Sequence, residues 1–297
     1  MVIHKQESLR STKQLLAALG LKPLVLGAYN QVRRVYYGTR REFRVDLDGA
    51  QAVFSTLDPH SKEFFFYRYD NGEMHEPVVT LELVSRLKGA KVFADVGAHL
   101  GYFACIAGAV FPNLNLYLFE MNHNLVDLIE RNLSANKLNG AQLMNKAVSD
   151  RRRKISYEDK SVDAGLSMAV EDVQSSDAGE GLAQGESVSL DEFFAGKDAP
   201  DVVKIDVQGA EMQVLRGAKG IIERHSPILF LEVHPKLLGS FGTSVQEIHE
   251  FLESHGYDRI RLITEHREEE RRLVELDAAA DRMKNTHMLL CENSARA

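Results

Sequence analysis

The sequence predicts an α/β fold built on a doubly wound, mainly parallel sheet, with an N-terminal extension. Two observations lead to this prediction. At residues 92–103 a short apolar run contains an acid, breaks at Gly97 and resumes at helical spacing, which indicates a buried strand, a tight turn and a helix. Along the rest of the chain, apolar runs alternate with amphipathic helical stripes, the order that builds a parallel sheet with helices on its faces.

The composition is that of an ordinary globular protein. The 297 residues are 44% hydrophobic and 27% charged, and no stretch approaches the ~20 apolar residues of a membrane-spanning helix. We expect an extension over residues 1–75 that packs on the core and one larger domain over residues 76–297. The net charge of -7 argues against nucleic acid as the main partner, because its binding depends on clustered Lys and Arg. A homodimer is left open.

The cysteines and the N-terminal residues bear on the compartment. Cys105 and Cys291 are too few for a disulfide framework or a cysteine-based metal site, and each lies in an apolar segment that predicts a buried thiol. The apolar run at residues 15–19 is too short for the core of a signal peptide, so we expect a cytoplasmic location.

Residues 1–75 are expected to form a helix and a hairpin. Leu residues between 9 and 19 form a weakly amphipathic stripe, and two short strands at 42–47 and 51–55 flank the turn pair Asp48-Gly49. The aromatic run at 64–69 predicts a sheet edge packed on the main core, with a substrate-stacking surface as the alternative.

The larger domain is expected to begin with a helix at Glu76-Pro77 that ends at Gly89. The expected strands are residues 91–96, 114–120, 141–148, 201–207, 228–233, 257–263 and 287–291. Helices are expected between the first three strands. One further helix is expected after residue 211 and another after residue 245. Probable strand fragments at 154–157 and 187–190 flank a long Gly- and Ser-rich loop at 161–186, which is expected to be mobile or functional. The charged connection 265–284 predicts a solvated helix or arm.

The turn after the strand at 91–96 predicts the class of ligand. In an open α/β sheet a ligand lies beyond the carboxyl ends of the strands, which places Asp95 and this turn at the floor of a pocket. Gly97 and Gly101 are present, but His99 stands where a dinucleotide fingerprint has its middle glycine. His99 and Asp95 disfavour a pyrophosphate and favour S-adenosylmethionine, which carries an amino group, a sulfonium and hydroxyls. A purely structural turn is the alternative.

Three segments carry a family pattern. They are DVGAHLGYF at 95–103, the pair Phe119-Glu120, and VKIDVQGAE at 203–211 followed by VLRGA at 214–218. Together they resemble the FkbM family of S-adenosylmethionine-dependent methyltransferases. Shorter matches lie at 147–150, 189–193 and 230–233. The resemblance implies a seven-stranded, class I methyltransferase-like Rossmann sheet with its last strand antiparallel, and methyl transfer to oxygen.

The chain departs from the family pattern at two positions. Gln208 and Met121 stand where the family usually has glutamate and proline. If that glutamate is a base or a metal ligand, Gln208 puts the role in doubt.

Six residues are the candidates for holding the cofactor. Glu120, at the end of the second strand, is expected to accept hydrogen bonds from both ribose hydroxyls. Asp95 is expected to hold the methionine amino group directly or through water, and Gly97 lets the backbone and the cofactor meet without an intervening Cβ. His99 and Gly101 complete the turn. The family resemblance places Ala147, at the end of the third strand, beside the adenine ring.

Asp206 and His234, at the ends of the fourth and fifth strands, are the candidate catalytic bases for an acceptor hydroxyl. A capping or surface role is an equal alternative for His234. Glu211 ranks below them, because the first turn of a helix favours a carboxylate through the helix dipole alone. Asp206 and Glu232 leave a divalent metal open, but no dense cluster of carboxylates and histidines requires one, and none is predicted.

The leading hypothesis is therefore an O-methyltransferase that acts on a hydroxyl of a sugar, a glycosylated compound or a polyketide-type small molecule. The aromatic run at 64–69 and the loop at 161–186 are expected to line the acceptor pocket, with the loop closing as a lid. The alternatives are an NAD-dependent oxidoreductase and a methyltransferase-like module that binds a partner without catalysis.

Overall fold

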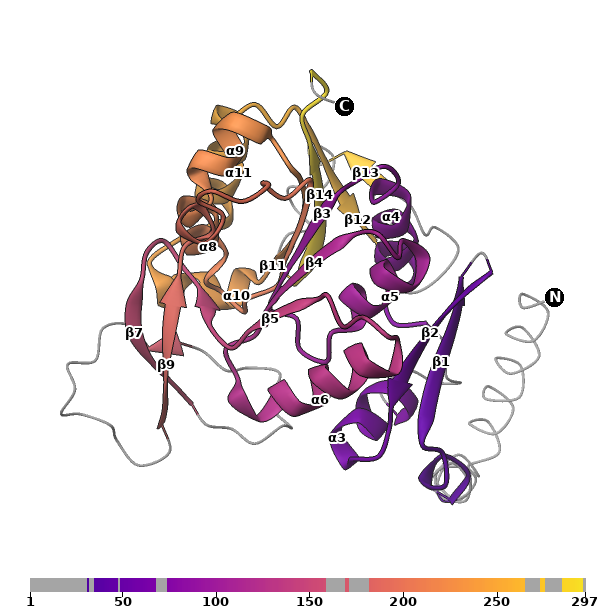
Figure 1. Cartoon of the computed structure of the whole chain (residues 1–297). Helices are drawn as coiled ribbons and strands as arrows, with labels where there is room; N and C mark the ends of the chain where they lie inside the picture. The colour runs from indigo at the N-terminus through magenta and orange to yellow at the C-terminus, as the bar shows by residue number, and fades with distance from the viewer. Residues whose placement is uncertain are drawn as a thin grey trace, which may run out of the picture. The chain divides into compact units, whose positions relative to one another are not determined.

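The computed structural model describes residues 31, 35–47, 49–67, 74–158, 169–170, 182–264, 273–275 and 285–295 (Figure 1). Backbone contacts group the chain into two compact units, one from residues 1–43 and 56–72 and one from residues 44–55 and 73–297. The helix expected around residues 9–19 and the turn residue Asp48 lie outside the described residues.

The first unit is held together by aromatic side chains. It contains α3 (Pro59–Lys62) and the π-helix η1 (Glu63–Tyr67). In η1, Phe65 stacks on Phe43 with ring centroids 5.1 Å apart, and Phe66 stacks on Tyr37 at 4.7 Å. The prediction of a sheet edge here was wrong: the aromatic residues 64–67 form a helical turn, and Phe64, Phe65 and Phe66 are buried.

The second unit is built on a sheet that has eight strands within the described residues, in the order β5-β4-β3-β10-β11-β14-β12-β13. The strands are β3 (Val92–Val96), β4 (Asn115–Phe119), β5 (Gln142–Met144), β10 (Val202–Ile205), β11 (Ile228–Val233), β12 (Arg259–Ile263), β13 (Leu273–Glu275) and β14 (His287–Glu292). Pairing is parallel from β5 through to β11 and antiparallel around β14. The predicted doubly wound sheet of seven strands with the last one antiparallel is confirmed, and the short β13 is added at its edge.

Helices cover both faces of this sheet. They are α4 (Pro77–Arg86), α5 (Tyr102–Val110), α6 (His123–Ala135), α7 (Leu190–Phe193), α8 (Glu211–Gly217), α9 (Lys219–His225), α10 (Pro235–Leu238), the 3-10 helix η2 (Gly239–Phe241) and α11 (Val245–Ser254). Figure 1 shows α8, α9 and α11 on one side of the central strands and α4 and α5 on the other. Side chains of α7, α8, α9 and α11 join the apolar residues of β3, β10 and β11 in one buried core.

The single helix predicted after residue 211 is two helices, α8 and α9, joined at Ala218. Gly217 lies against the backbone of Ser149, where an added Cβ would come within 2.0 Å of the carbonyl oxygen. The amide of Ala218 then bonds to Leu215, three residues back, instead of continuing the α-helical pattern.

A second sheet changes several sequence-based boundaries. It has the order β6-β9-β7-β8 and consists of β6 (Ala147–Val148), β7 (Arg153–Glu158), β8 (Ala169–Val170) and β9 (Leu182–Val188). The strand predicted over 141–148 is therefore two strands in two sheets, broken at residues 145–146. Residues 182–186, predicted as loop, pair with β7, and Ser189 caps α7 by accepting the amide hydrogen of Glu192. The rest of the predicted loop, apart from β8, lies outside the described residues.

The predicted hairpin is confirmed as β1 (Glu42–Leu47) and β2 (Ala50–Ser55), which form a two-stranded sheet with Gly49 at φ +87° in the turn. Two asparagines of α6 bind β2. Asn136 accepts from the amide of Val53, and Asn132 accepts from the amide of Ser55 at the same distance of 2.8 Å. Asn132 also donates to the carbonyl of Leu100 at 2.8 Å, which ties this contact to the turn after β3.

The predicted buried thiols are confirmed, since Cys105 and Cys291 are both free and buried. Among the helices that the structure describes, none combines the length and the apolar character needed to cross a membrane. Of the charged connection at 265–284, only β13 is described, and it is a strand where a helix or arm was expected.

Candidate active site

The doubly wound order places the ends of β3 and β10 side by side. The chain runs outward from β3 to β4 and β5, then returns to pair β10 on the other side of β3. This reversal is the position at which open α/β sheets bind ligands. Asp95 is the second-to-last residue of β3. The turn after β3 carries Gly97 to Gly101, and the turn after β10 carries Asp206 to Gly209.

The two turns touch through their backbones. Gly97 has φ +80°, and a Cβ at this position would lie 1.9 Å from the carbonyl oxygen of Asp206. Glycine is therefore required here by the approach of the second turn, a reason that differs from the clearance for a cofactor that the sequence suggested. His99 at φ +53° and Gln208 at φ +55° are two non-glycine residues in the left-handed region, one in each turn. Such strained residues cluster at functional sites.

Glu120 follows β4 and is tied to the turn after β3. Its Oε2 accepts from the amide of His99 at 2.8 Å, and its Oε1 accepts from the amide of Asn122 at 2.9 Å. Burial raises the pKa of Glu120 to about 7, against these two hydrogen bonds, which lower it. Because a carboxylate oxygen can accept two hydrogen bonds, each oxygen keeps one acceptor position for a ligand.

Asp95 and Lys204 are buried neighbours on paired strands. Both are nearly inaccessible, at 1% and 2% exposure, and they lie opposite each other in the register of β3 and β10. The Nζ of Lys204 is 3.4 Å from Oδ2 of Asp206 and 4.7 Å from the ring centroid of Phe103. Burial lowers the pKa of Lys204, but the charges of Asp206 and Asp95 outweigh it and hold that pKa above its usual range, so the lysine stays charged.

The carboxylate of Asp95 is enclosed without a full set of partners. Neither oxygen forms a hydrogen bond of ordinary geometry within the described residues, although the amide of Ala104 lies near enough to favour the charged form. Burial raises the pKa of Asp95 to about 6, the charge of Lys204 opposes this and that of Asp206 adds to it. A buried carboxylate with unmet acceptors is costly, which favours a cationic partner at this position.

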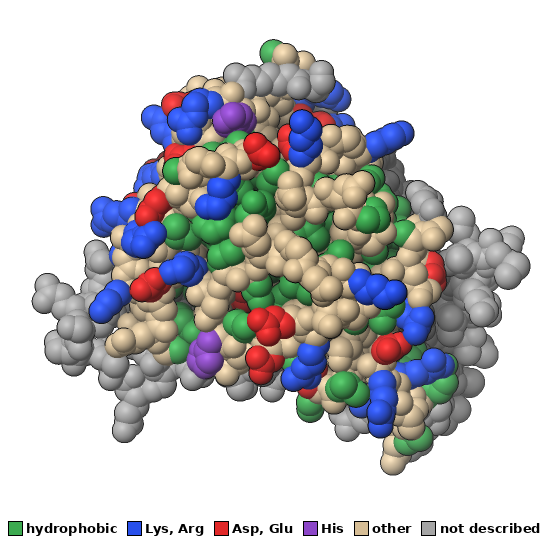
Figure 2. All heavy atoms as spheres, viewed as in Figure 1, with side chains coloured by type: hydrophobic (Ala, Val, Ile, Leu, Met, Phe, Trp, Pro, Cys, Tyr) green, Lys and Arg blue, Asp and Glu red, His purple; other side chains and the backbone are tan. Residues whose placement is uncertain are grey.

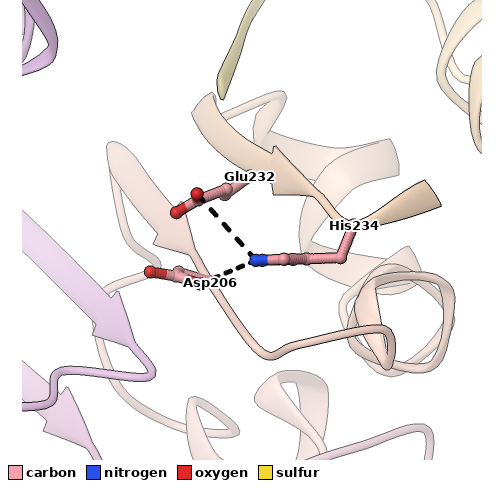
Figure 3. Close-up of side chains that lie close together, drawn as sticks. All are labelled: Asp206, Glu232 and His234. Atoms are coloured by element: carbon pink, nitrogen blue, oxygen red, sulfur yellow. Dashed lines mark ion pairs between the residues drawn. The ribbon is translucent and has the colours of Figure 1, made fainter. Parts of the chain in front are cut away.

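A second cluster lies at the ends of β10 and β11 and consists of Asp206, Glu232 and His234 (Figure 3). The Nε2 atom of His234 is 3.8 Å from Oδ1 of Asp206 and 3.9 Å from Oε1 of Glu232. The side chains of Asp206 and Glu232 are 26% and 18% exposed, whereas that of His234 is 7% exposed. The carboxylates therefore reach solvent while the imidazole is fixed behind them.

Glu211, at the start of α8, orients His234. Its Oε1 lies 2.7 Å from Nδ1 of His234 and also accepts from the amide of Gly209 at 2.9 Å. Glu211 is fully buried. A carboxylate at this position accepts a hydrogen bond from Nδ1–H of the imidazole, and this contact directs the Nε2 edge of the ring toward Asp206 and Glu232.

The two carboxylates of this cluster differ in protonation. Burial raises the pKa of Glu232 well above its usual range, and the neighbouring charge of Asp206 adds to the effect. Burial also acts to raise the pKa of Asp206, but the charge of Lys204 and a hydrogen bond from Glu232 outweigh it and hold that pKa below its usual range. The two shifts run in opposite directions, so the surroundings favour the carboxylate form of Asp206 and the protonated form of Glu232.

The structure brings Asp206 and His234 together, and it joins Asp95, Gly97, His99, Gly101 and Glu120 around the turn after β3. Ala147 is different. The third strand ends at Met144, and Ala147 lies in β6, paired with β9 in the second sheet, so the expectation that it closes the third strand was wrong.

The sequence analysis missed Lys204 and underrated Glu211. A signal was present for Lys204, because a lysine inside the otherwise apolar strand VVKI must have a buried partner. For Glu211 the helix dipole was a sufficient explanation, and its partner His234 is 23 residues away.

Comparison with known proteins identifies the domain that carries this site. The family model described as the methyltransferase FkbM domain matches residues 95–259, more than half of the chain. The chain belongs to the FkbM methyltransferase family. The match begins at Asp95 and extends beyond His234, so both clusters lie within the family domain. The predicted resemblance is confirmed, and membership favours a methyltransferase over the NAD-dependent oxidoreductase.

Solved structures with a related architecture are distant in sequence. The FkbM methyltransferase of Methylobacillus flagellatus KT is 15% identical with a TM-score of 0.45, over 68% of this chain and 43% of that one, so this chain spans less than half of its length. An S-adenosylmethionine-dependent O-methyltransferase of Thermotoga maritima is 12% identical with a TM-score of 0.42, over 84% of this chain and 77% of that one. A precorrin-6y C5,15-methyltransferase of Geobacter metallireducens GS-15 is 15% identical with a TM-score of 0.41, over 73% and 88%. No curated protein matches the chain.

Proposed function

We propose that this FkbM-family protein transfers the methyl group of S-adenosylmethionine to a hydroxyl of a sugar, a glycosylated compound or a polyketide-type small molecule. When bound, S-adenosylmethionine supplies a methyl group on a positively charged sulfur. The observation that carries the proposal is the position of Asp206 and His234, two proton acceptors 3.8 Å apart beside the glycine turn after β3.

The residues around the turn after β3 fit this cofactor. The two remaining acceptor positions of Glu120 match the two hydroxyls of a ribose. The carboxylate of Asp95 has no hydrogen-bond donor of ordinary geometry in the described residues, and an amino group would supply one. Since both Asp95 oxygens are enclosed, an amino group would reach them only through a water molecule or after the covering side chains move. His99 and Gly101 belong to the same turn and stay in the proposed cofactor site.

The acceptor hydroxyl must lose a proton as it is methylated, and the second cluster can take it. The charge of Lys204 and a hydrogen bond from Glu232 hold the pKa of Asp206 below its usual range, and the contact of Glu211 with Nδ1 directs Nε2 of His234 toward Asp206. Asp206 follows β10, whose turn touches the turn after β3, and His234 follows β11 on the far side of β10. An acceptor hydroxyl held over the end of β10 would therefore face a base.

Charge on the described surface favours a small-molecule acceptor over nucleic acid. On the face in Figure 2, lysine and arginine side chains are interspersed with acidic ones. Among the described residues, Arg152 pairs with Glu192, Lys146 with Glu186 and Lys219 with Glu223. A phosphate backbone would have to displace these acids. The lid over residues 161–186 lies largely outside the described residues and stays a prediction.

Calorimetric titration of the full chain with S-adenosylhomocysteine and, separately, with NAD tests the proposal. We expect S-adenosylhomocysteine to bind at one site and NAD to give no heat. Binding of NAD without S-adenosylhomocysteine would reject the assigned cofactor. Binding of S-adenosylhomocysteine without methylation of any hydroxyl acceptor would instead favour the non-catalytic module.

A further inference from the structure

We propose that Asp206, Glu232 and His234 form a binding site for a divalent first-row metal ion, with Mn²⁺ as a suitable ion. Their ligand atoms, two carboxylate oxygens and one imidazole nitrogen, all lie within 4.8 Å of one another. Carboxylates suit Mn²⁺ and Mg²⁺, and imidazole favours the later first-row metals, so the mixed set selects a borderline divalent cation. The inference deepens the proposed function and rests on it for the role of the ion.

The distances fit three groups that converge on one ion. At 3.8 and 3.9 Å, the contacts from Nε2 of His234 to the two carboxylate oxygens are too long for hydrogen bonds. A metal bonds to imidazole nitrogen and carboxylate oxygen at ~2.0–2.2 Å, which sets its ligand atoms about 3–3.5 Å apart. The two contacts of His234 would shorten by about half an ångström, and the three ligand atoms, which lie within 4.8 Å of one another, would close around the ion. Two of them are partly exposed, so they have room to do so.

His234 supplies an independent indication of a ligand. Its side chain is only 7% exposed, and its Nε2 makes no hydrogen bond within the described residues. Figure 3 shows this atom directed between the two carboxylates. Its other nitrogen is held at 2.7 Å by the buried carboxylate of Glu211. Metal-binding histidines characteristically have such a carboxylate behind them, because it fixes the tautomer and raises the basicity of the ligating nitrogen.

The local charge balance also calls for a cation. Three carboxyl groups, those of Asp206, Glu211 and Glu232, surround the imidazole, and Lys204 is the cation paired with them in the described residues. Lys204 contacts Oδ2 of Asp206 and leaves Oδ1 facing His234. A bound divalent ion would offset the negative charge that gathers around the imidazole.

Gln208 competes for the same oxygen. Its Nε2 lies 3.2 Å from Oδ1 of Asp206. Rotation of the amide by half a turn would present its oxygen there instead, and an amide oxygen is itself a ligand for hard divalent ions. The chain would thus keep a metal-compatible group at the position where the family pattern has glutamate.

A metal ion would change how the acceptor loses its proton. Asp206, Glu232 and His234 would hold the ion, and the ion would supply a positive charge that lowers the pKa of an acceptor hydroxyl. The second cluster would then favour loss of the proton through the ion that it holds, in addition to its own acceptor groups. The acceptor oxygen then forms its bond to the methyl carbon as the bond from that carbon to sulfur breaks, and the sulfur is left as a neutral thioether.

Binding of Mn²⁺ to the full chain, after treatment with a chelator and dialysis, tests the site by electron paramagnetic resonance and calorimetry. We expect one Mn²⁺ per chain. Glu232→Gln and His234→Ala should each weaken binding at least tenfold, and Glu211→Gln about tenfold through its effect on His234. The matched control is Glu253→Gln on α11, an exposed carboxylate outside the cluster, which should bind like the wild type.

Absence of Mn²⁺ binding to the wild-type chain would overturn the proposal, as would unchanged binding in folded Glu232→Gln and His234→Ala. The wild-type result does not depend on the folding of any variant. Titration with S-adenosylhomocysteine and a melting curve show whether each variant is folded. Full methyl transfer in the presence of chelator would reject the role of the ion and leave the proposed function standing. Specific Mn²⁺ binding without methyl transfer would support the site and reject the proposed function.

Discussion

The two acid clusters of this protein arise from the same feature of the fold and differ in burial. Asp95 and Glu120 lie at the ends of β3 and β4 with 1% and 8% exposure, whereas Asp206 and Glu232 lie at the ends of β10 and β11 and are accessible to solvent. In the first pair, backbone amides donate to Glu120, and Asp95 faces Lys204. The second pair surrounds a histidine. The difference suggests that the first pair binds a ligand and that the second pair acts on protons or a metal.

The largest expected effect comes from Asp206→Asn, which removes the charge from the second cluster. We expect turnover to fall by ~100-fold or more, the scale of a lost general base or positioning group, while affinity for S-adenosylhomocysteine stays within a few fold. Steady-state kinetics and calorimetry on the same preparation measure the two effects. If turnover persists, Asp206 is not the group that gives the second cluster its role, and His234→Ala becomes the next variant.

Glu120→Ala is the reciprocal change in the first cluster. We expect affinity for S-adenosylhomocysteine to weaken by ~1–3 kcal/mol, because two ribose hydroxyls would lose their acceptor. The amides of His99 and Asn122 also lose their partner, so Glu120→Gln is the control that retains a side-chain acceptor. Unchanged affinity in a folded Glu120→Ala protein would remove this residue from the cofactor site.

Glu211→Gln separates orientation of His234 from its chemistry. The variant keeps the shape of the side chain but weakens the carboxylate that holds Nδ1 at 2.7 Å. We expect turnover to decrease about tenfold, with a changed pH–rate profile and unchanged affinity for S-adenosylhomocysteine. A uniform loss of stability without a change in the pH profile would indicate that Glu211 is only structural.

The first cluster also predicts an effect of pH on cofactor binding. Burial raises the pKa of Asp95 to about 6 and that of Glu120 to about 7. Protonation of Asp95 removes the charge that would attract an amino group. Protonation of Glu120 removes one of the acceptor sites for a ribose hydroxyl. Affinity for S-adenosylhomocysteine should therefore fall as pH decreases from about 8 to about 5.5, by at most ~tenfold per pH unit for each proton. Asp95→Asn should flatten part of this dependence.

The same carboxyl groups predict how the stability of the cofactor-free protein changes with pH. Asp95 and Glu120 both bind a proton more tightly in the folded state than in the unfolded state. Their contribution to the free energy of unfolding is therefore fully present below the unfolded pKa values of about 4. It is lost as the pH rises through the folded pKa values, about 6 for Asp95 and about 7 for Glu120. In melting experiments, stabilisation by S-adenosylhomocysteine should grow over that range. A stabilisation that instead decreases with rising pH would contradict the assignment of these buried acids to the cofactor.

The sequence predicted the parts of the site that follow from strand periodicity. Asp95, Glu120 and Asp206 were predicted because each acid lies at the end of a buried apolar run, and neighbouring parallel strands end at one edge of a sheet. The partnership of Glu211 with His234 was not predicted, because it joins a helix start to a different strand end. The break between Met144 and Ala147 was missed for a similar reason: the apolar pattern continues across it, while the pairing changes from β4 to β9.

The central claim is that the second cluster directs methyl transfer to oxygen, and isotope-labelled transfer tests it most directly. The full chain is incubated with S-adenosylmethionine labelled on its methyl group and with sugars, glycosylated compounds and polyketides, and the labelled position in the product is determined by nuclear magnetic resonance. The account predicts an O-methyl product that is lost in Asp206→Asn while S-adenosylhomocysteine still binds. A label found on nitrogen or carbon, or an O-methyl product undiminished in Asp206→Asn, would contradict it.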